Sequence, residues 1–110
     1  MTNLPTDFDR KITKRYHYNH SELTYMEIVF TKHAEEKFDI LKRYRVIITR
    51  QKIIEILKNP GLRDYSRNPL IITQGILDTS HVLRIVYRTQ HSNIIVITFY
   101  PGRKSHYEKT

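Results

Sequence analysis

Three apolar runs in the second half of the chain, separated by short polar loops, constrain the fold most strongly. They cover Leu70 to Leu77, His81 to Thr89 and Ile94 to Tyr100. All three are rich in β-branched and aromatic residues, which is typical of strands. Because only short loops separate the runs, consecutive strands must turn back on one another as hairpins. The sequence therefore predicts an antiparallel meander.

Two amphipathic segments precede these strands and are predicted to be helices. Apolar residues recur at helical spacing from Lys32 to Tyr44, and a second apolar face lies between Arg50 and Lys58. Thr31 and Thr49 stand immediately before the two segments, where a hydroxyl can cap the first backbone N–H groups. The tripeptide Asn59-Pro60-Gly61 ends the second helix, because proline cannot continue the hydrogen-bond ladder.

The alternating run from Glu27 to Thr31 is predicted to be the first strand. The order of strand, two helices and three strands indicates an α+β fold in which both helices pack on one face of an antiparallel sheet. We expect residues 26–110 to form this domain. Residues 1–25 are polar and show neither a helical nor a strand period, which predicts a flexible or loosely docked N-terminal arm.

The net charge is the first indication of function. A chain of 110 residues with a net charge of +8 attracts polyanions to its surface. Nucleic acid is the commonest partner of this kind. The alternative is that the charge serves solubility or nonspecific contact with the ribosome. The chain has no apolar segment long enough to cross a membrane and no apolar leader, so we expect a cytoplasmic protein without membrane contact.

Several catalytic classes are not supported by the sequence. There is no cysteine, no glycine-rich phosphate loop and no His-Glu-x-x-His motif. The six histidines are scattered without the spacing of metal ligands. We therefore predict neither a metal site nor a cofactor.

The middle strand of the meander carries two arginines on one side. Its alternation places Leu83, Ile85 and Tyr87 on the face toward the helices, and Arg84 and Arg88 on the other. An arginine among valines can be a residue that extends its charge to solvent from a half-exposed sheet. The alternative is an anion-binding face.

The last strand and the segment after it add further polar groups. Alternation places Ile95, Ile97 and Phe99 toward the helices and Tyr100 beside the arginines. Arginine and lysine bind phosphate, and histidine or tyrosine can stack on a base or carry a proton. The candidates in the closing segment are Arg103, Lys104, His106 and Tyr107.

His33 is predicted at the first turn of the first helix. The N-terminus of a helix attracts anions, so an imidazole there could help to hold a phosphate. The alternative is a histidine that packs or caps at the helix start.

Three stretches resemble a large prokaryotic domain family that is similar to BrnT and, more distantly, to the RelE and ParE toxins. They are residues 30–38, residues 48–60 and the ending Val96-Ile97-Thr98-Phe99-Tyr100-Pro101-Gly102-Arg103-Lys104. The resemblance spans residues 26–108. It implies the RelE-like fold and a toxin role beside a cognate antitoxin. RelE and BrnT members cleave RNA without metal, and ParE members inhibit gyrase.

The leading hypothesis is a metal-independent endoribonuclease toxin of a type II toxin–antitoxin system, which cleaves RNA by attack of the 2′-hydroxyl. By position, the resemblance implies that the catalytic groups are Arg84, Arg103, His106 and Tyr107. We expect His33, Arg88, Tyr100 and Lys104 to bind the RNA. The partners would be RNA, free or on the ribosome, and an antitoxin protein. The alternative is a noncatalytic RNA- or ribosome-binding module of the same fold, and a gyrase-directed binder is the third reading.

Overall fold

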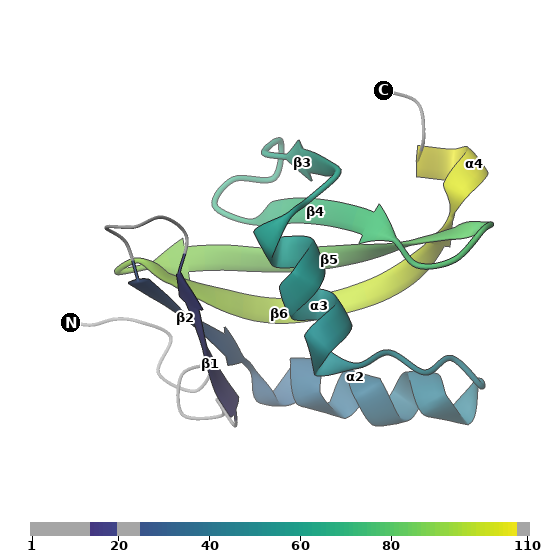
Figure 1. Ribbon diagram of the computed structural model, residues 1–110, viewed down its shortest axis with the longest axis horizontal. Helices are drawn as coiled ribbons and strands as arrows, with labels where there is room; N and C mark the ends of the chain where they lie inside the picture. The colour runs from purple at the N-terminus through teal and green to yellow at the C-terminus, as the bar shows by residue number, and fades with distance from the viewer. Residues whose placement is uncertain (1–13, 20–24, 108–110) are drawn as a thin grey trace.

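The computed structural model describes residues 14–19 and 25–107, in which helices pack against a six-stranded sheet (Figure 1). The strand order along the sheet is β1-β2-β6-β5-β4-β3. The strands are β1 (Lys14–Asn19), β2 (Tyr25–Phe30), β3 (Leu62–Asp64), β4 (Ile71–Ile76), β5 (His81–Gln90) and β6 (Asn93–Arg103). The helices are α2 (Lys32–Arg43), α3 (Arg50–Lys58) and α4 (Lys104–Tyr107). The predicted α+β class is confirmed.

Both predicted helices and both predicted caps are confirmed. The Thr31 hydroxyl accepts a hydrogen bond from the Ala34 N–H at 3.1 Å, and the Thr49 hydroxyl accepts one from Lys52 at 3.1 Å. The two helices are joined by Arg50, which donates to the Glu35 carboxylate. Within residues 14–19 and 25–107, no helix is both long and apolar enough to cross a bilayer.

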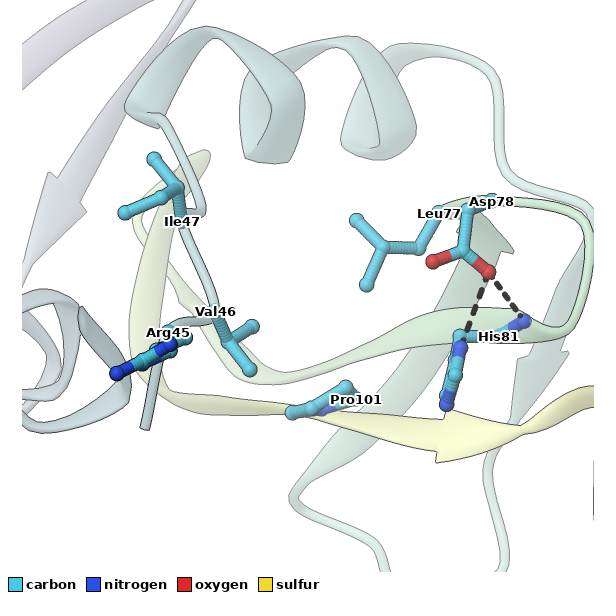
Figure 2. Close-up of a pocket in the computed structure, with 7 residues that line it drawn as sticks. All are labelled: Arg45, Val46, Ile47, Leu77, Asp78, His81 and Pro101. Atoms are coloured by element: carbon cyan, nitrogen blue, oxygen red, sulfur yellow. Dashed lines mark hydrogen bonds and ion pairs between the residues drawn. The ribbon is translucent and has the colours of Figure 1, made fainter. Parts of the chain in front are cut away.

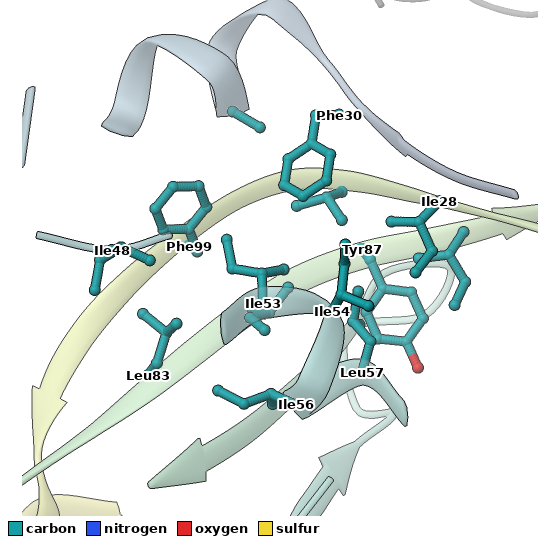
Figure 3. Packing of buried hydrophobic residues seen from close by; sticks show 14 of the residues in the cluster. Ile28, Phe30, Ile48, Ile53, Ile54, Ile56, Leu57, Leu83, Tyr87 and Phe99 are labelled. Atoms are coloured by element: carbon teal, nitrogen blue, oxygen red, sulfur yellow. The ribbon is translucent and has the colours of Figure 1, made fainter. Parts of the chain in front are cut away.

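The core lies between these two helices and one face of the sheet, which we call the helix-covered face. Phe38 of α2 contacts Phe30 of β2 and Phe99 of β6, with ring centroids 5.9 and 4.7 Å apart. Figure 3 shows the isoleucines of α3 on the same side of the sheet as Leu83 and Tyr87 of β5. The core residues of α3 and β5 are Ile53, Ile54, Ile56, Leu57, Leu83, Ile85 and Tyr87. The predicted packing of both helices on one face is confirmed, and the opposite face is called the open face.

The predicted meander is confirmed, but the prediction of a wholly antiparallel sheet is wrong. β4, β5 and β6 pair antiparallel in order, whereas β2 pairs parallel to β6. Parallel strands are usually buried on both faces and are apolar without alternation. The paired segments have this character, because all residues of 28–30 and of 94–96 are buried.

A β-bulge changes which side chains of β6 face the helices. Tyr87 pairs with Val96, but Val86 pairs with Thr98, so Ile97 has no counterpart on β5. One extra residue shifts the alternation of the strand by one position. The core residues of β6 are Ile94, Val96 and Phe99, whereas alternation alone predicts Ile95, Ile97 and Phe99. The prediction for Ile95 and Ile97 is therefore wrong.

Three short elements were not predicted. β1 pairs antiparallel with β2, so the prediction of no regular element before Met26 is wrong for Lys14–Asn19. β3 pairs with the edge of β4, and α4 follows β6 directly. Residues 1–13 and 20–24 of the predicted arm lie outside the described residues.

Candidate functional site

The open face carries a buried arginine at its centre. The register pairs Arg84 of β5 with Gln74 of β4 and with Tyr100 of β6. Directly opposed residues of antiparallel strands place their side chains on the same face, so these three stand in a row. The arginine is only 8% exposed.

Three residues contact this guanidinium from within the protein. Arg84 donates through Nη1 to Gln74 Oε1 at 2.5 Å and through Nε to the Tyr100 hydroxyl at 3.2 Å. Its Cζ lies 4.1 Å from the ring centre of Tyr107, which stacks on it as a cation–π partner. Gln74 Nε2 also donates to the Tyr107 carbonyl oxygen at 3.3 Å. We call Gln74, Arg84, Tyr100 and Tyr107 the Arg84 cluster.

Helix α4 brings Tyr107 into this cluster because the chain turns back over the end of the sheet. The Lys104 N–H donates to the Ser80 carbonyl at 2.8 Å, which fixes the start of the helix. Gly102 then lets the ring approach, since a Cβ there would lie 2.5 Å from Tyr107 Cε2. A larger residue at position 102 would therefore displace the ring from Arg84.

The cluster gives Arg84 a structural role that the sequence did not predict. A residue that is 8% exposed and bonded to Gln74 and Tyr100 has little surface left for a phosphate. A carboxylate also lies near: hydrogen bonds from Ser66 chiefly, and the charge of Arg84 to a smaller extent, hold the pKa of Asp64 below its usual range. Arg84 thus has a structural role on the open face, and its contact with a phosphate stays a prediction.

The structure does not bring together Arg84 and Arg103, which were both predicted among the catalytic groups. Arg103 pairs with His81, three positions from Arg84 along β5, so the two arginines start from opposite faces of the sheet. The sequence predicts the end of the last strand at Tyr100, but β6 continues through Pro101 to Arg103. Arg103 is exposed on the helix-covered side.

The other predicted residues are divided between the two faces. Tyr100 and Tyr107 join the cluster, and Lys104 and the exposed His106 lie on the same short helix as Tyr107. Arg88 belongs to β5 near its far end, where its Nη1 donates to Gln90 Oε1 at 2.6 Å. His33 is exposed on α2, in the helix layer. The structure therefore assembles only part of the predicted site.

A pocket of about 400 Å³ lies beside the cluster, and we call it the α4 pocket. Its apolar surface comes from Leu62, Ile76 and Val82. Lys104 and Tyr107 supply a cation and an aromatic ring at its margin. Gln74 also borders it, so the pocket and the Arg84 cluster share two residues. Such a mixed lining suits a ligand with one flat apolar part and one anionic part.

A second pocket, of about 330 Å³, lies on the helix-covered side where Leu77 and Pro101 meet the loop between α2 and α3 (Figure 2). We call it the His81 pocket. Asp78 Oδ1 lies 3.0 Å from His81 Nδ1 and accepts the Ser80 N–H at 2.9 Å. The Ser80 N–H first, and His81 second, hold the pKa of Asp78 below its usual value.

His81 was not predicted as a site residue, because only His33 and His106 were expected to bind a phosphate or carry a proton. Its signal is the spacing of Asp78 and His81 across a hairpin loop, where a carboxylate can reach a side chain three residues later. Within residues 25–107, no group of three histidine or carboxylate side chains is arranged to hold a metal ion.

Comparison of the chain with models of known protein families, with curated proteins and with solved structures gave no match. Its function must therefore be inferred from the Arg84 cluster and from the two pockets.

Proposed function

We propose that the protein binds single-stranded RNA at the α4 pocket. The observation that carries the proposal is the fixed position of the Tyr107 ring, which is held on Arg84 and also borders a pocket with Lys104. A ring that is already immobilised can stack on a base at low cost in entropy, and a neighbouring lysine can contact the phosphate. The net charge of +8 supports a polyanionic ligand.

The RelE-like assignment is part of this proposal. From β2 to β6 the chain follows the predicted order of strand, two helices and three strands, apart from the short β3. Both helices cover one face, as that fold requires. These features support the assignment, although the parallel pairing of β2 with β6 was not expected from the sequence.

Fluorescence anisotropy with a labelled single-stranded RNA tests the binding site. Tyr107→Ala is expected to weaken binding roughly tenfold, which is typical for the loss of one stacked base. Lys104→Ala is expected to weaken binding and to reduce the salt slope by about 0.7, the value for one phosphate contact on a single strand.

The matched controls are Tyr44→Ala and Arg43→Ala, which remove an exposed ring and an exposed charge at the end of α2. Both controls should bind RNA within about twofold of the wild type. Equal losses for the controls and for the α4 variants would show that binding follows net charge alone and would overturn the proposed site.

The second candidate function is the metal-independent endoribonuclease toxin with a cognate antitoxin. The observation that favours it is the imidazole of His81, which a carboxylate holds in one orientation. Cleavage of RNA in EDTA, by the protein alone or with translating ribosomes, would support this function. Growth arrest on expression would support the toxin role, whereas harmless expression with intact RNA binding would favour the binding module.

A further inference from the structure

We propose that the His81 pocket is the centre of RNA cleavage, with His81 Nε2 as the group that moves the proton. The substrate class is an RNA phosphodiester with a free 2′-hydroxyl, so the assignment rests on the proposed binding of RNA. It replaces His106, which the sequence suggested as proton carrier. The only described ring contact of His106 is with Tyr107, at a centroid distance of 6.2 Å.

The hydrogen bond that His81 donates to Asp78 fixes the tautomer of His81. A carboxylate only accepts hydrogen bonds, so the Nδ1 that lies 3.0 Å from Asp78 Oδ1 must carry the hydrogen. The lone pair is then on Nε2, as a general base requires. Figure 2 shows Nε2 on the side of the ring away from Asp78, toward β6.

Asp78 is itself held in place, and therefore it can act as a positioning residue. Its Oδ1 accepts the backbone N–H of Ser80 at 2.9 Å and that of His81 at 2.8 Å. The Ser80 hydroxyl also lies 3.1 Å from His81 Nδ1. The whole β4–β5 turn thus orients one imidazole, while the His81 side chain keeps 40% of its surface exposed.

The charges that face His81 come from three further elements. Asp78 belongs to the β4–β5 turn, Arg103 is the cross-strand partner of His81 on β6, and Arg45 lines the pocket from the loop between α2 and α3. Arg45 is placed by the bond from its N–H to the Lys42 carbonyl at 2.9 Å. Arg45, which lines the pocket together with His81, favours the extra negative charge that forms on phosphorus in the transition state.

The volume and lining of the pocket suit one nucleotide. A space of about 330 Å³ lies within the range of small-ligand sites. Leu77, Ile47 and Pro101 provide apolar walls for a base or ribose. Ile47 keeps 65% of its surface exposed, so this wall is accessible from solvent.

The two pockets lie close enough for one RNA strand to reach both. The Lys104 N–H of the α4 pocket donates to the Ser80 carbonyl at 2.8 Å, and Ser80 is the residue next to His81. A strand that contacts Lys104 can therefore continue around the end of β5 and β6. Binding at Tyr107 and cleavage at His81 are thus separate steps on neighbouring surfaces.

The reaction is an internal transesterification. His81 Nε2 takes the proton of the 2′-hydroxyl, the 2′-oxygen forms a bond to phosphorus, and the bond from phosphorus to the next 5′-oxygen breaks. Water gives a proton to the leaving 5′-oxygen, and the imidazolium returns its proton to the hydroxide that remains. The products are a 2′,3′-cyclic phosphate and a 5′-hydroxyl.

The test compares His81→Ala with His106→Ala on a single-stranded RNA in EDTA, with and without translating ribosomes. His81→Ala is expected to lower the cleavage rate by at least about 100-fold, the usual range for loss of a general acid or base, with RNA affinity within about twofold. His106→Ala should cleave at nearly the wild-type rate. If His81→Ala still cleaves RNA at nearly the wild-type rate, or if only His106→Ala loses cleavage, the assignment is overturned.

Two further measurements separate this assignment from the proposed function. Asp78→Asn should slow cleavage and mix the tautomers of His81, which the ¹⁵N shifts of the imidazole report. In the wild type, an RNA with 2′-O-methyl groups should shift the His81 signals without being cleaved. If the wild type binds RNA and leaves it intact, RNA binding stands and the cleavage centre is refuted; if no RNA binds, both proposals fall.

Discussion

The Arg84 cluster and the His81 pocket use neighbouring positions of β5 in opposite ways. Arg84 is 8% exposed, and its guanidinium is hydrogen-bonded to Gln74 and Tyr100 and covered by Tyr107. His81 keeps 40% of its surface exposed and has one nitrogen fixed by Asp78. A buried polar side chain with several internal partners stabilises the fold, whereas an exposed one that is held at a single atom can still act on a ligand.

The largest expected effect in this comparison is that of Arg84→Ala on stability. The substitution leaves the buried amide of Gln74 and the partly buried hydroxyl of Tyr100 without their partner, which typically costs about 2–3 kcal/mol of unfolding free energy. Urea unfolding followed by circular dichroism measures the loss. Arg103→Ala is the matched control, because an exposed arginine should change stability by no more than about 0.5 kcal/mol. Similar losses in both variants would contradict the distinction between the two faces.

The second prediction separates stability from binding with two glycines. A Cβ at Gly102 would lie 2.5 Å from the Tyr107 ring, and a Cβ at Gly75 would lie 2.6 Å from Ile56 on the helix-covered face. Each alanine substitution is expected to cost roughly 1–2 kcal/mol through overpacking. Only Gly102→Ala should also weaken RNA binding, because it moves the ring that borders the α4 pocket. Equal affinities of the two variants in anisotropy would show that the position of Tyr107 does not matter.

The smallest expected effect is on the stability of the fold at acid pH. The Ser80 N–H and His81 keep the pKa of Asp78 below its ordinary value of 3.8 in the folded state. The charged carboxylate therefore stabilises the fold above that value, and this contribution is lost as the pH falls through the lowered pKa. Asp78→Asn should flatten the decline of the urea midpoint below about pH 4.

Asp64→Asn provides the matching measurement on the other side of the molecule. Hydrogen bonds from Ser66 lower the pKa of Asp64. Asp64→Asn should therefore also reduce the decline of the urea midpoint at acid pH. Of these two variants, Asp78→Asn is the one that should change the ¹⁵N shifts of His81, because the Asp78 carboxylate is hydrogen-bonded to that ring. If neither variant changes the decline of the urea midpoint with falling pH, the hydrogen bonds of Asp64 and Asp78 do not have the effect described.

Local features of the sequence predicted the helices and the hairpins well. Thr31 and Thr49 predicted where the two helices begin, because a hydroxyl at the N-cap is a strong local signal. The pairing of β2 with β6 joins residues far apart in the chain, so no local pattern indicates it. The turn at His91 and Ser92 also lacks the usual Asn-Gly signature, although both residues have the positive φ of a two-residue hairpin turn.

The candidate site was predicted only in part, because strand alternation depends on where strands end. Alternation placed Tyr100 and Arg84 together, and the structure confirms their contact. Arg103 was assigned to a tail after the strand, since Pro101 and Gly102 usually interrupt a strand. β6 tolerates Pro101 because β2 pairs only with residues 94–96, which leaves this part of β6 at an edge.

The pairing of β2 with β6 has a consequence for how the protein folds. The Glu27 N–H donates to the Asn93 side chain at 3.3 Å, although the two residues are 66 positions apart. Contacts of such high sequence separation must close a long loop before they contribute any energy, and they slow folding. During synthesis, one edge of β2 therefore stays unpaired until β6 has been made, and this edge exposes β2 to aggregation in the nascent chain.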